Sequence, residues 1–234
     1  MKLSFVIVFI FSIVFTNCNN DGIPSTVSDT STNNWTTNSN QPQLPFFSET
    51  EKGITVVSEG PRGGSFIPTI GGLMAYRLFR IGIVNSNTVA AELEMSFEKT
   101  VGLIRPALTD SLRIWLIPDA YVPSAKVDQF NFGIENLEKL LDTCQNKSPQ
   151  IKCQLLPQLT KYVYIVALYK QDRDLARALV YFTHQPPVVS FLPTDTSAAK
   201  NNNEKSLGLT FGIGIDPPNN YAYFSCGKIT FHSF

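Results

Sequence analysis

Apolar and polar residues alternate most strictly along residues 89–98. One face of this segment carries Val89, Ala91, Leu93, Met95 and Phe97, and the other carries Glu92, Glu94, Ser96 and Glu98. A period of two is typical of a strand that is covered on one side, because successive side chains point to opposite faces of the sheet. The pattern therefore predicts a strand with one buried and one solvated face.

A second β-prone run, residues 77–84, comes just before this strand, and the polar residues 85–88 separate the two. Two such runs joined by a short turn-forming segment predict a β-hairpin. The glutamates of the second strand are then expected to face Arg77 or Arg80 across the pair.

Further strands are predicted along the rest of the chain. Their ranges are 54–58, 112–117, 162–169, 175–182, 207–215, 221–225 and 229–234. The run 162–169 is apolar on both faces, which favours a central strand, and residues 171–174 are expected to turn into its partner, 175–182. Glycines alternate with apolar residues in 207–215, which indicates close backbone approach, a bulge or a bend.

One short helix is predicted over residues 134–143, with Asp128 or Asn131 as its N-cap. Its apolar residues at helical spacing are Ile134, Leu137, Leu140 and Leu141. Many short strands with a single helix predict an antiparallel β-sandwich, and a β-barrel is the alternative. We expect one such domain over residues 48–234.

The N-terminal residues have a different pattern. Met1 and Lys2 precede an apolar run, residues 3–15, that is interrupted only by two serines. As a helix this run is about 20 Å long, which is shorter than the roughly 30 Å hydrocarbon core of a bilayer. A charged start and a short apolar core predict a signal peptide for export, and an uncleaved anchor helix is the alternative.

The apolar run ends in Phe15-Thr16-Asn17-Cys18. This ending resembles the lipobox of bacterial lipoproteins, in the relaxed form found in spirochaetes, with Phe15 in place of leucine and Asn17 in place of a small residue. The resemblance implies that residues 1–17 are a signal peptide and that the mature chain begins at an acylated Cys18, which anchors it to a membrane of the cell envelope. Ordinary cleavage and secretion is the alternative.

Residues 18–47 are rich in Asn, Ser and Thr and contain few apolar side chains. Such a segment buries too little apolar surface to offset its ordering entropy, so we expect a disordered linker. About 25 residues of this kind span roughly 28 Å on average, enough to hold a domain clear of a lipid surface.

Cysteine use is consistent with export. Cys144 and Cys153 flank a polar, turn-rich stretch and could close a disulfide loop, which would contribute roughly 2–3 kcal/mol of stability. Cys226 is then expected to be a buried small hydrophobe, although a bridge from Cys226 to either of the other two remains an alternative.

Composition and motifs argue against several functions. Lys+Arg and Asp+Glu number 19 each, so nothing directs the chain to nucleic acid. The two histidines, His184 and His232, belong to no zinc motif, and no metal or cofactor is predicted. The stretch 60–64 is expected to be a plain turn, with an anion cradle around Arg62 as the alternative. Carboxylates in the turn 171–174 could bind calcium, although solvated charges are the simpler interpretation.

Glu92 and Glu94 lie on one strand face, roughly 7 Å apart, and are the candidate acid/base pair, although solvated surface charges are the simpler interpretation. Tyrosines are frequent after residue 160, and Tyr is a favoured contact residue. The leading hypothesis is a non-enzymatic envelope lipoprotein that binds a protein or a glycan. The alternatives are a structural envelope-assembly lipoprotein and a carboxylate-dependent hydrolase.

Overall fold

The computed structural model describes residues 47–69, 72–98, 100–103, 111–122, 130–143, 148–170, 176–194, 205–215 and 220–231. The predicted signal peptide, Cys18, most of the linker and Cys144 lie outside the described residues, as does the turn 171–174. Within these ranges the structure contains no helix with the length and hydropathy needed to cross a bilayer.

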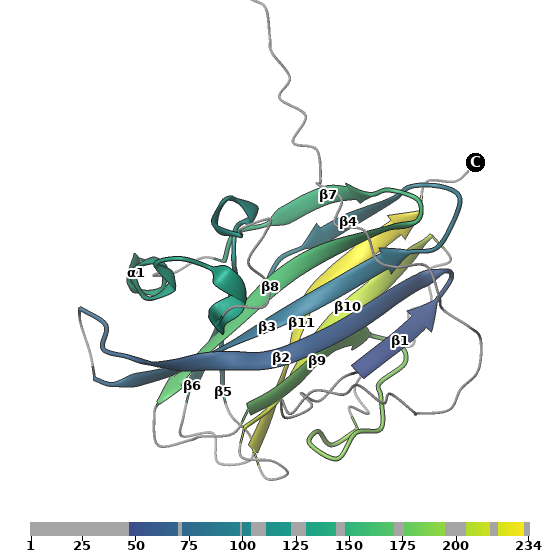
Figure 1. The fold of residues 1–234 in the computed structure, drawn as a ribbon. Coiled ribbons are helices and arrows are strands. Elements are labelled where there is room, and N and C mark those ends of the chain that lie inside the picture. The colour runs from purple at the N-terminus through teal and green to yellow at the C-terminus, as the bar shows by residue number, and fades with distance from the viewer. Residues whose placement is uncertain are drawn as a thin grey trace, which may run out of the picture.

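Two antiparallel sheets pack face to face (Figure 1). Sheet A has six strands in the order β1 (Phe47–Glu51), β2 (Ile54–Phe66), β3 (Met74–Asn85), β8 (Leu159–Lys170), β6 (Ser111–Leu116) and β5 (Val101–Leu103). Sheet B has five strands in the order β7 (Ile151–Leu155), β4 (Ala91–Met95), β11 (Asn220–Phe231), β10 (Ser206–Ile215) and β9 (Ala176–Phe182). The predicted β-sandwich is confirmed.

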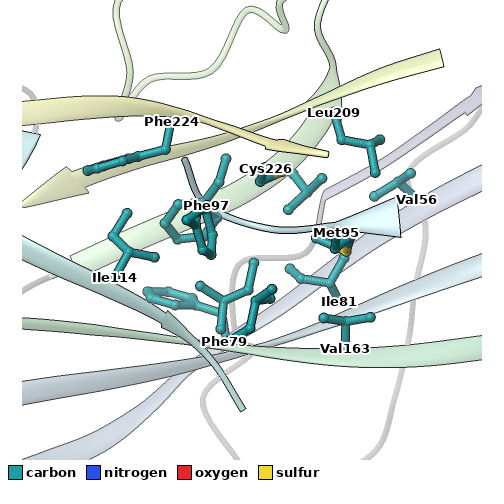
Figure 2. Packing of buried hydrophobic residues seen from close by; sticks show 14 of the residues in the cluster. Val56, Phe79, Ile81, Met95, Phe97, Ile114, Val163, Leu209, Phe224 and Cys226 are labelled. Carbon is teal, nitrogen blue, oxygen red and sulfur yellow. The ribbon is translucent and has the colours of Figure 1, made fainter. Parts of the chain in front are cut away.

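The main core lies between the sheets and is built from the inward residue of each alternating pair (Figure 2). Phe97 packs edge to face against Phe211 and Phe224, with ring centroids 6.1 and 6.3 Å apart, a favourable geometry for aromatic rings. Cys226 lies fully buried among these residues, and burial raises the pKa of its thiol. The prediction that Cys226 is a buried small hydrophobe is confirmed.

The predicted hairpin between 77–84 and 89–98 is wrong, because β3 belongs to sheet A and β4 belongs to sheet B. Asn85 occupies the corner where the chain passes between the sheets. Its buried side-chain amide donates to the carbonyls of Val89 and Leu155, both at 2.8 Å. These bonds satisfy two backbone carbonyls beside the corner, one before β4 and one at the end of β7, which stabilises the corner where the strands separate.

The predicted central position of 162–169 is confirmed, since β8 lies between β3 and β6. Its expected pairing with 175–182 is wrong, because β9 pairs with β10 at the edge of sheet B. Two outward N–H groups of β9 bond to side chains of sheet A: Val180 N–H to Ser58 Oγ at 2.9 Å and Phe182 N–H to Glu49 Oε2 at 3.0 Å. The two sheets therefore meet along this seam.

The close approach predicted for the glycine-rich strand β10 is confirmed. A Cβ at Gly214 would lie 2.2 Å from the carbonyl oxygen of Phe191, and the register of β10 against β11 shifts at Leu209. The strand predicted at 221–225 and the described part of the one predicted at 229–234 form the single strand β11. Gly227, the partner of Leu209, has a φ of +135°, which allows β11 to continue past this register shift.

The outer face of sheet A is covered by the segment between β6 and β7. This segment contains η1 (Asp119–Tyr121), η2 (Phe130–Gly133) and α1 (Leu137–Thr143), and we call these three elements the cover. Its apolar side chains form a second core with outward residues of β3 and β8. The predicted helix 134–143 is confirmed in its second part only. Asn131 does not cap it, because its side chain bonds to Tyr76, and Asp128 lies outside the described residues.

Candidate binding surface

The two candidate acid/base residues both lie on the outward face of β4. Glu92 pairs with Lys152 at 2.9 Å, and Glu94 lies 3.7 Å from Lys228 and accepts a hydrogen bond from Gln150 at 2.8 Å. Hydrogen bonding and charge pairing with Glu92 raise the pKa of Lys152. These contacts are those of a cross-strand charge ladder in solvent.

The expected contact between these glutamates and Arg77 or Arg80 is wrong, because the arginines belong to the other sheet. Among the described residues, no group of three or more His, Cys, Asp or Glu side chains is placed to bind a metal ion.

The cysteine predictions are tested in part. Cys153 lies half-buried on β7, where it is opposite Leu93 and packs against the main core. The described residues contain no disulfide bond, so the alternative Cys153–Cys226 bridge is wrong. The Cys144–Cys153 disulfide stays a prediction, since Cys144 lies outside the described residues, and so does acylation of Cys18.

Most of the tyrosines after residue 160 serve packing. Tyr164, Tyr169 and Tyr181 are buried, whereas Tyr221 and Tyr223 are half-buried, with ring centroids 5.5 Å apart. The Tyr223 hydroxyl donates to the carbonyl of Pro193. Tyrosine frequency is therefore a poor guide to a contact surface in this chain.

The stretch 60–64 is not the predicted plain turn but lies inside β2. The register of β2 against β3 shifts between Glu59 and Arg62, and Gly60 has a φ of +129°. A bulge of this kind inserts extra residues into one strand and redirects the side chains beside it. Here Arg62 lies over the ring of Phe132 from the cover, with the guanidinium carbon 4.1 Å from the ring centroid.

Phe132 is fully buried between two arginines. In addition to Arg62, Arg80 of β3 lies 5.2 Å from its ring centroid, and Tyr164 of β8 packs edge to face against it at 5.7 Å. Arginine over an aromatic face is an attractive cation–π contact, and it strengthens when the pair is shielded from water.

The backbone around Phe132 is left-handed over three consecutive residues. Asn131, Phe132 and Gly133 have φ values of 57°, 53° and 74°. For most residues with a Cβ this conformation costs roughly 1–2 kcal/mol, so Phe132 stores strain, whereas asparagine adopts it more readily. The Asn131 amide donates to the Tyr76 hydroxyl at 2.8 Å, and its buried Oδ1 has no hydrogen-bond partner in the described part of the chain.

A half-buried ion pair lies beside this turn. Arg80 donates to Glu59 Oε2 through both Nε, at 2.9 Å, and Nη2, with side-chain exposures of 16% for Arg80 and 26% for Glu59. Burial alone would lower the pKa of Arg80, but hydrogen bonding and charge pairing with Glu59 outweigh it and raise that pKa. Arg80 also lies 5.0 Å from the ring centroid of Tyr162.

We name this region the arginine–aromatic face and define it as Glu59, Arg62, Arg80, Phe132 and Tyr162, with the exposed aromatics Phe130 and Tyr121 of the cover. Phe130 is 68% exposed and comes directly before the strained turn, and η1, which ends at Tyr121, is tied to β8 by a 2.6 Å ion pair between Asp119 and Lys161. The only sequence signal for this face was the glycine-rich stretch around Arg62.

Comparison of the chain with protein-family models, with curated proteins and with solved structures gave no significant match.

Proposed function

We propose that this chain is an exported, lipid-anchored protein of the cell envelope whose β-sandwich binds a protein partner through the arginine–aromatic face. The signal-like N-terminus and the lipobox-like residues ending at Cys18 support the anchor. The proposal gives the domain a binding role and no catalytic residue. Glu92 and Glu94 give no support to a hydrolase, because each already lies beside a lysine of a neighbouring strand.

The observation behind the binding site is that several costly irregularities meet in one place. The left-handed turn belongs to the cover, and Arg62 beside the β2 bulge and Arg80 of the half-buried Glu59–Arg80 pair both contact its Phe132 ring. A sheet covered by a helix needs none of these features. Strained backbone and shielded charges of this kind cluster at functional sites, since the surrounding structure must compensate for them.

A protein partner fits this face better than a glycan. Arg and Tyr are enriched among the residues that dominate protein–protein binding, particularly where they pack together and are shielded from water. The exposed ring of Phe130 is an apolar anchor that a partner pocket can bury, and it lies in the same short element, η2, as Phe132, which Arg62 and Arg80 contact. A flat aromatic platform lined by hydrogen-bonding groups would be more typical of a sugar site.

Two measurements test the proposal. Mass spectrometry of the native N-terminus is expected to find acyl chains on Cys18, and a mature form that begins elsewhere would contradict the anchor. For binding, the full chain is isolated from its own envelope by affinity tag, as wild type and as Phe130→Ala, Arg62→Ala and Val188→Ala variants. Val188 is 91% exposed in a different loop and serves as the control.

We expect a specific protein to be retained by wild type and by Val188→Ala, and about tenfold less of it by the two variants of the face. Equal retention by all four chains would contradict the site. Retention of a glycan instead of a protein would contradict the choice of partner. An envelope protein as partner would favour the assembly role, whereas an external protein would favour surface display.

A further inference from the structure

The connection between β2 and β3 presents two exposed apolar side chains. Ile67 is 75% exposed and Leu73 is 47% exposed. In Figure 1 this connection projects from the edge of the molecule beside α1, at the far end of β2 from β1. We call Ile67, Pro68, Thr69, Gly72 and Leu73 the hairpin tip. Residues 70 and 71 lie outside the described part of the chain and enter none of the argument.

The hairpin tip is tied to the cover by a carboxylate. The Thr69 backbone N–H donates to Asp142 Oδ1 at 2.8 Å, and the Thr69 hydroxyl donates to Asp142 Oδ2. These two bonds lower the pKa of Asp142, so the carboxylate stays ionised and continues to accept them. The bonds tie the tip to α1, and Ile67 and Leu73 are exposed in this arrangement.

We propose that the hairpin tip contacts a lipid bilayer and inserts Ile67 and Leu73 into its interfacial region. Two apolar side chains are far fewer than the roughly 20–30 residues a side of a stable protein–protein interface. Shallow contact with a bilayer needs only a few apolar groups, because an anchor elsewhere in the chain supplies the remaining affinity.

This inference rests on the lipid anchor of the proposed function. Between Cys18 and Phe47 lie residues 19–46, and a polar linker of that length spans roughly 30 Å. An acylated Cys18 would therefore keep the domain within reach of the membrane that holds it. The tip then needs to bind only weakly, since the local concentration of lipid is high.

Charges near the tip predict which lipids it accepts. Lys139 and Lys170 are opposed by Glu138 and by Asp142, the carboxylate that binds Thr69. Lys170 is the register partner of Met74, at the base of the hairpin, and Lys139 and Glu138 lie on α1 with Asp142. Among the described residues of α1 and at the base of the hairpin these charges balance, so they give no net attraction to anionic headgroups. The tip is therefore expected to contact zwitterionic lipid as well as it contacts anionic lipid.

The test uses the full chain isolated from its own envelope and reconstituted into phosphatidylcholine vesicles. An environment-sensitive fluorophore is attached at Ile67→Cys, at Leu73→Cys or, as the control, at Val188→Cys, with Cys144 and Cys153 changed to serine. Ile67 and Val188 are both highly exposed, so neither substitution is expected to disturb folding. Nitroxide-labelled lipid in the vesicles quenches a fluorophore that enters the bilayer interface.

We expect quenching at positions 67 and 73 to be several-fold stronger than at 188, and unchanged when a third of the lipid is phosphatidylglycerol. If the chain floats with the vesicles but position 67 is quenched no more than position 188, the tip contact is wrong and the anchor stands. If the wild-type chain does not float with the vesicles at all, both the anchor and the tip contact are contradicted.

Discussion

The outer face of sheet B across β7, β4 and β11 carries charged side chains in solvent, whereas the outer face of sheet A packs an apolar cluster beneath the cover. On sheet B, Glu92 and Lys152 form a pair on adjacent strands. On sheet A, Glu59 and Arg80 form a half-buried pair beside a fully buried Phe132. The two carboxylates are similarly exposed, 28% for Glu92 and 26% for Glu59, so the faces differ in the cation, which is 62% exposed at Lys152 and 16% exposed at Arg80.

The two faces also differ in backbone strain and in unsatisfied polar groups. The ladder on sheet B needs no strained backbone, and exposed pairs of this kind contribute about 0–1 kcal/mol. The face on sheet A retains a left-handed turn at Asn131 and Phe132 and an orphaned amide oxygen, each of which lowers stability. We infer that sheet B's outer face is a solvated surface and that sheet A's outer face is the one adapted to binding.

The largest effect is expected from Phe132→Ala. This change removes a fully buried ring that two arginines and Tyr164 contact, so the left-handed turn loses the packing that offsets its strain. We expect the free energy of unfolding to fall by about 3–5 kcal/mol, as for other buried phenylalanines. Urea unfolding of the full chain measures it, and a loss below 1 kcal/mol would show that the cover is not held by this ring.

The next largest effect is expected from a pair of matched mutations that compares the two ion pairs. Arg80→Met keeps an apolar side chain but leaves the Glu59 carboxylate without its partner, and should cost about 1–3 kcal/mol. Lys152→Met is the matched change on sheet B and should cost less than about 0.5 kcal/mol, because its pair is exposed. Equal losses in urea unfolding would remove the contrast between the faces.

Phe130→Ala should leave stability within about 0.5 kcal/mol of wild type, because the ring is mostly in solvent. Two phenylalanines two residues apart then have separable roles, with Phe132 for stability and Phe130 for binding. Thermal unfolding beside the retention assay checks this. If Phe130→Ala loses much stability, unfolding would explain its weaker retention of the partner protein, and a direct contact by Phe130 would be contradicted.

The sequence predicted the outer face of sheet B better than that of sheet A, because only sheet B's face has a local hydrophobic pattern. The period-two pattern around Leu93 depends on one buried face, so it correctly predicted β4 and its solvated glutamates. The pattern contains nothing about which sheet a strand joins. That choice depends on Asn85, whose side chain satisfies backbone groups 4 and 70 residues away.

The arginine–aromatic face had no comparable signal. Phe132 follows a mixed polar and apolar stretch, and its own left-handed backbone goes against local propensity, since a phenylalanine rarely adopts that conformation. The ion pair joins Glu59 and Arg80 from different strands, so no local pattern reveals it. The β2 bulge was predicted to be a turn because it contains Gly60 and Pro61. Tertiary packing overrides local preference at this site.

The smallest effect concerns the seam where the two sheets meet. Burial raises the pKa of Glu49, and the charge of Glu51 raises it further, while the hydrogen bond from the Phe182 N–H and the charge of His184 lower it. A carboxyl with a raised pKa binds protons more readily when folded. Its contribution to stability is therefore fully present below the unfolded pKa and is lost as the pH rises through the folded pKa.

Glu49→Gln keeps an oxygen that can accept the Phe182 N–H bond and carries no charge. We expect the variant to be slightly more stable than wild type at pH 7, with the difference disappearing below about pH 4, where Glu49 is protonated. Unfolding curves of both chains across this range measure the difference. A stability gain that does not change with pH would contradict the role assigned to the charge.

The most direct test of the central claim places a photoreactive side chain on each outer face of the full chain in its native cells. Position 130 samples the arginine–aromatic face, and position 152 samples the charge ladder of sheet B. The account predicts a cross-linked protein adduct from position 130 that is absent from position 152. Adducts of equal yield from both positions, or an adduct from position 152 alone, would contradict it.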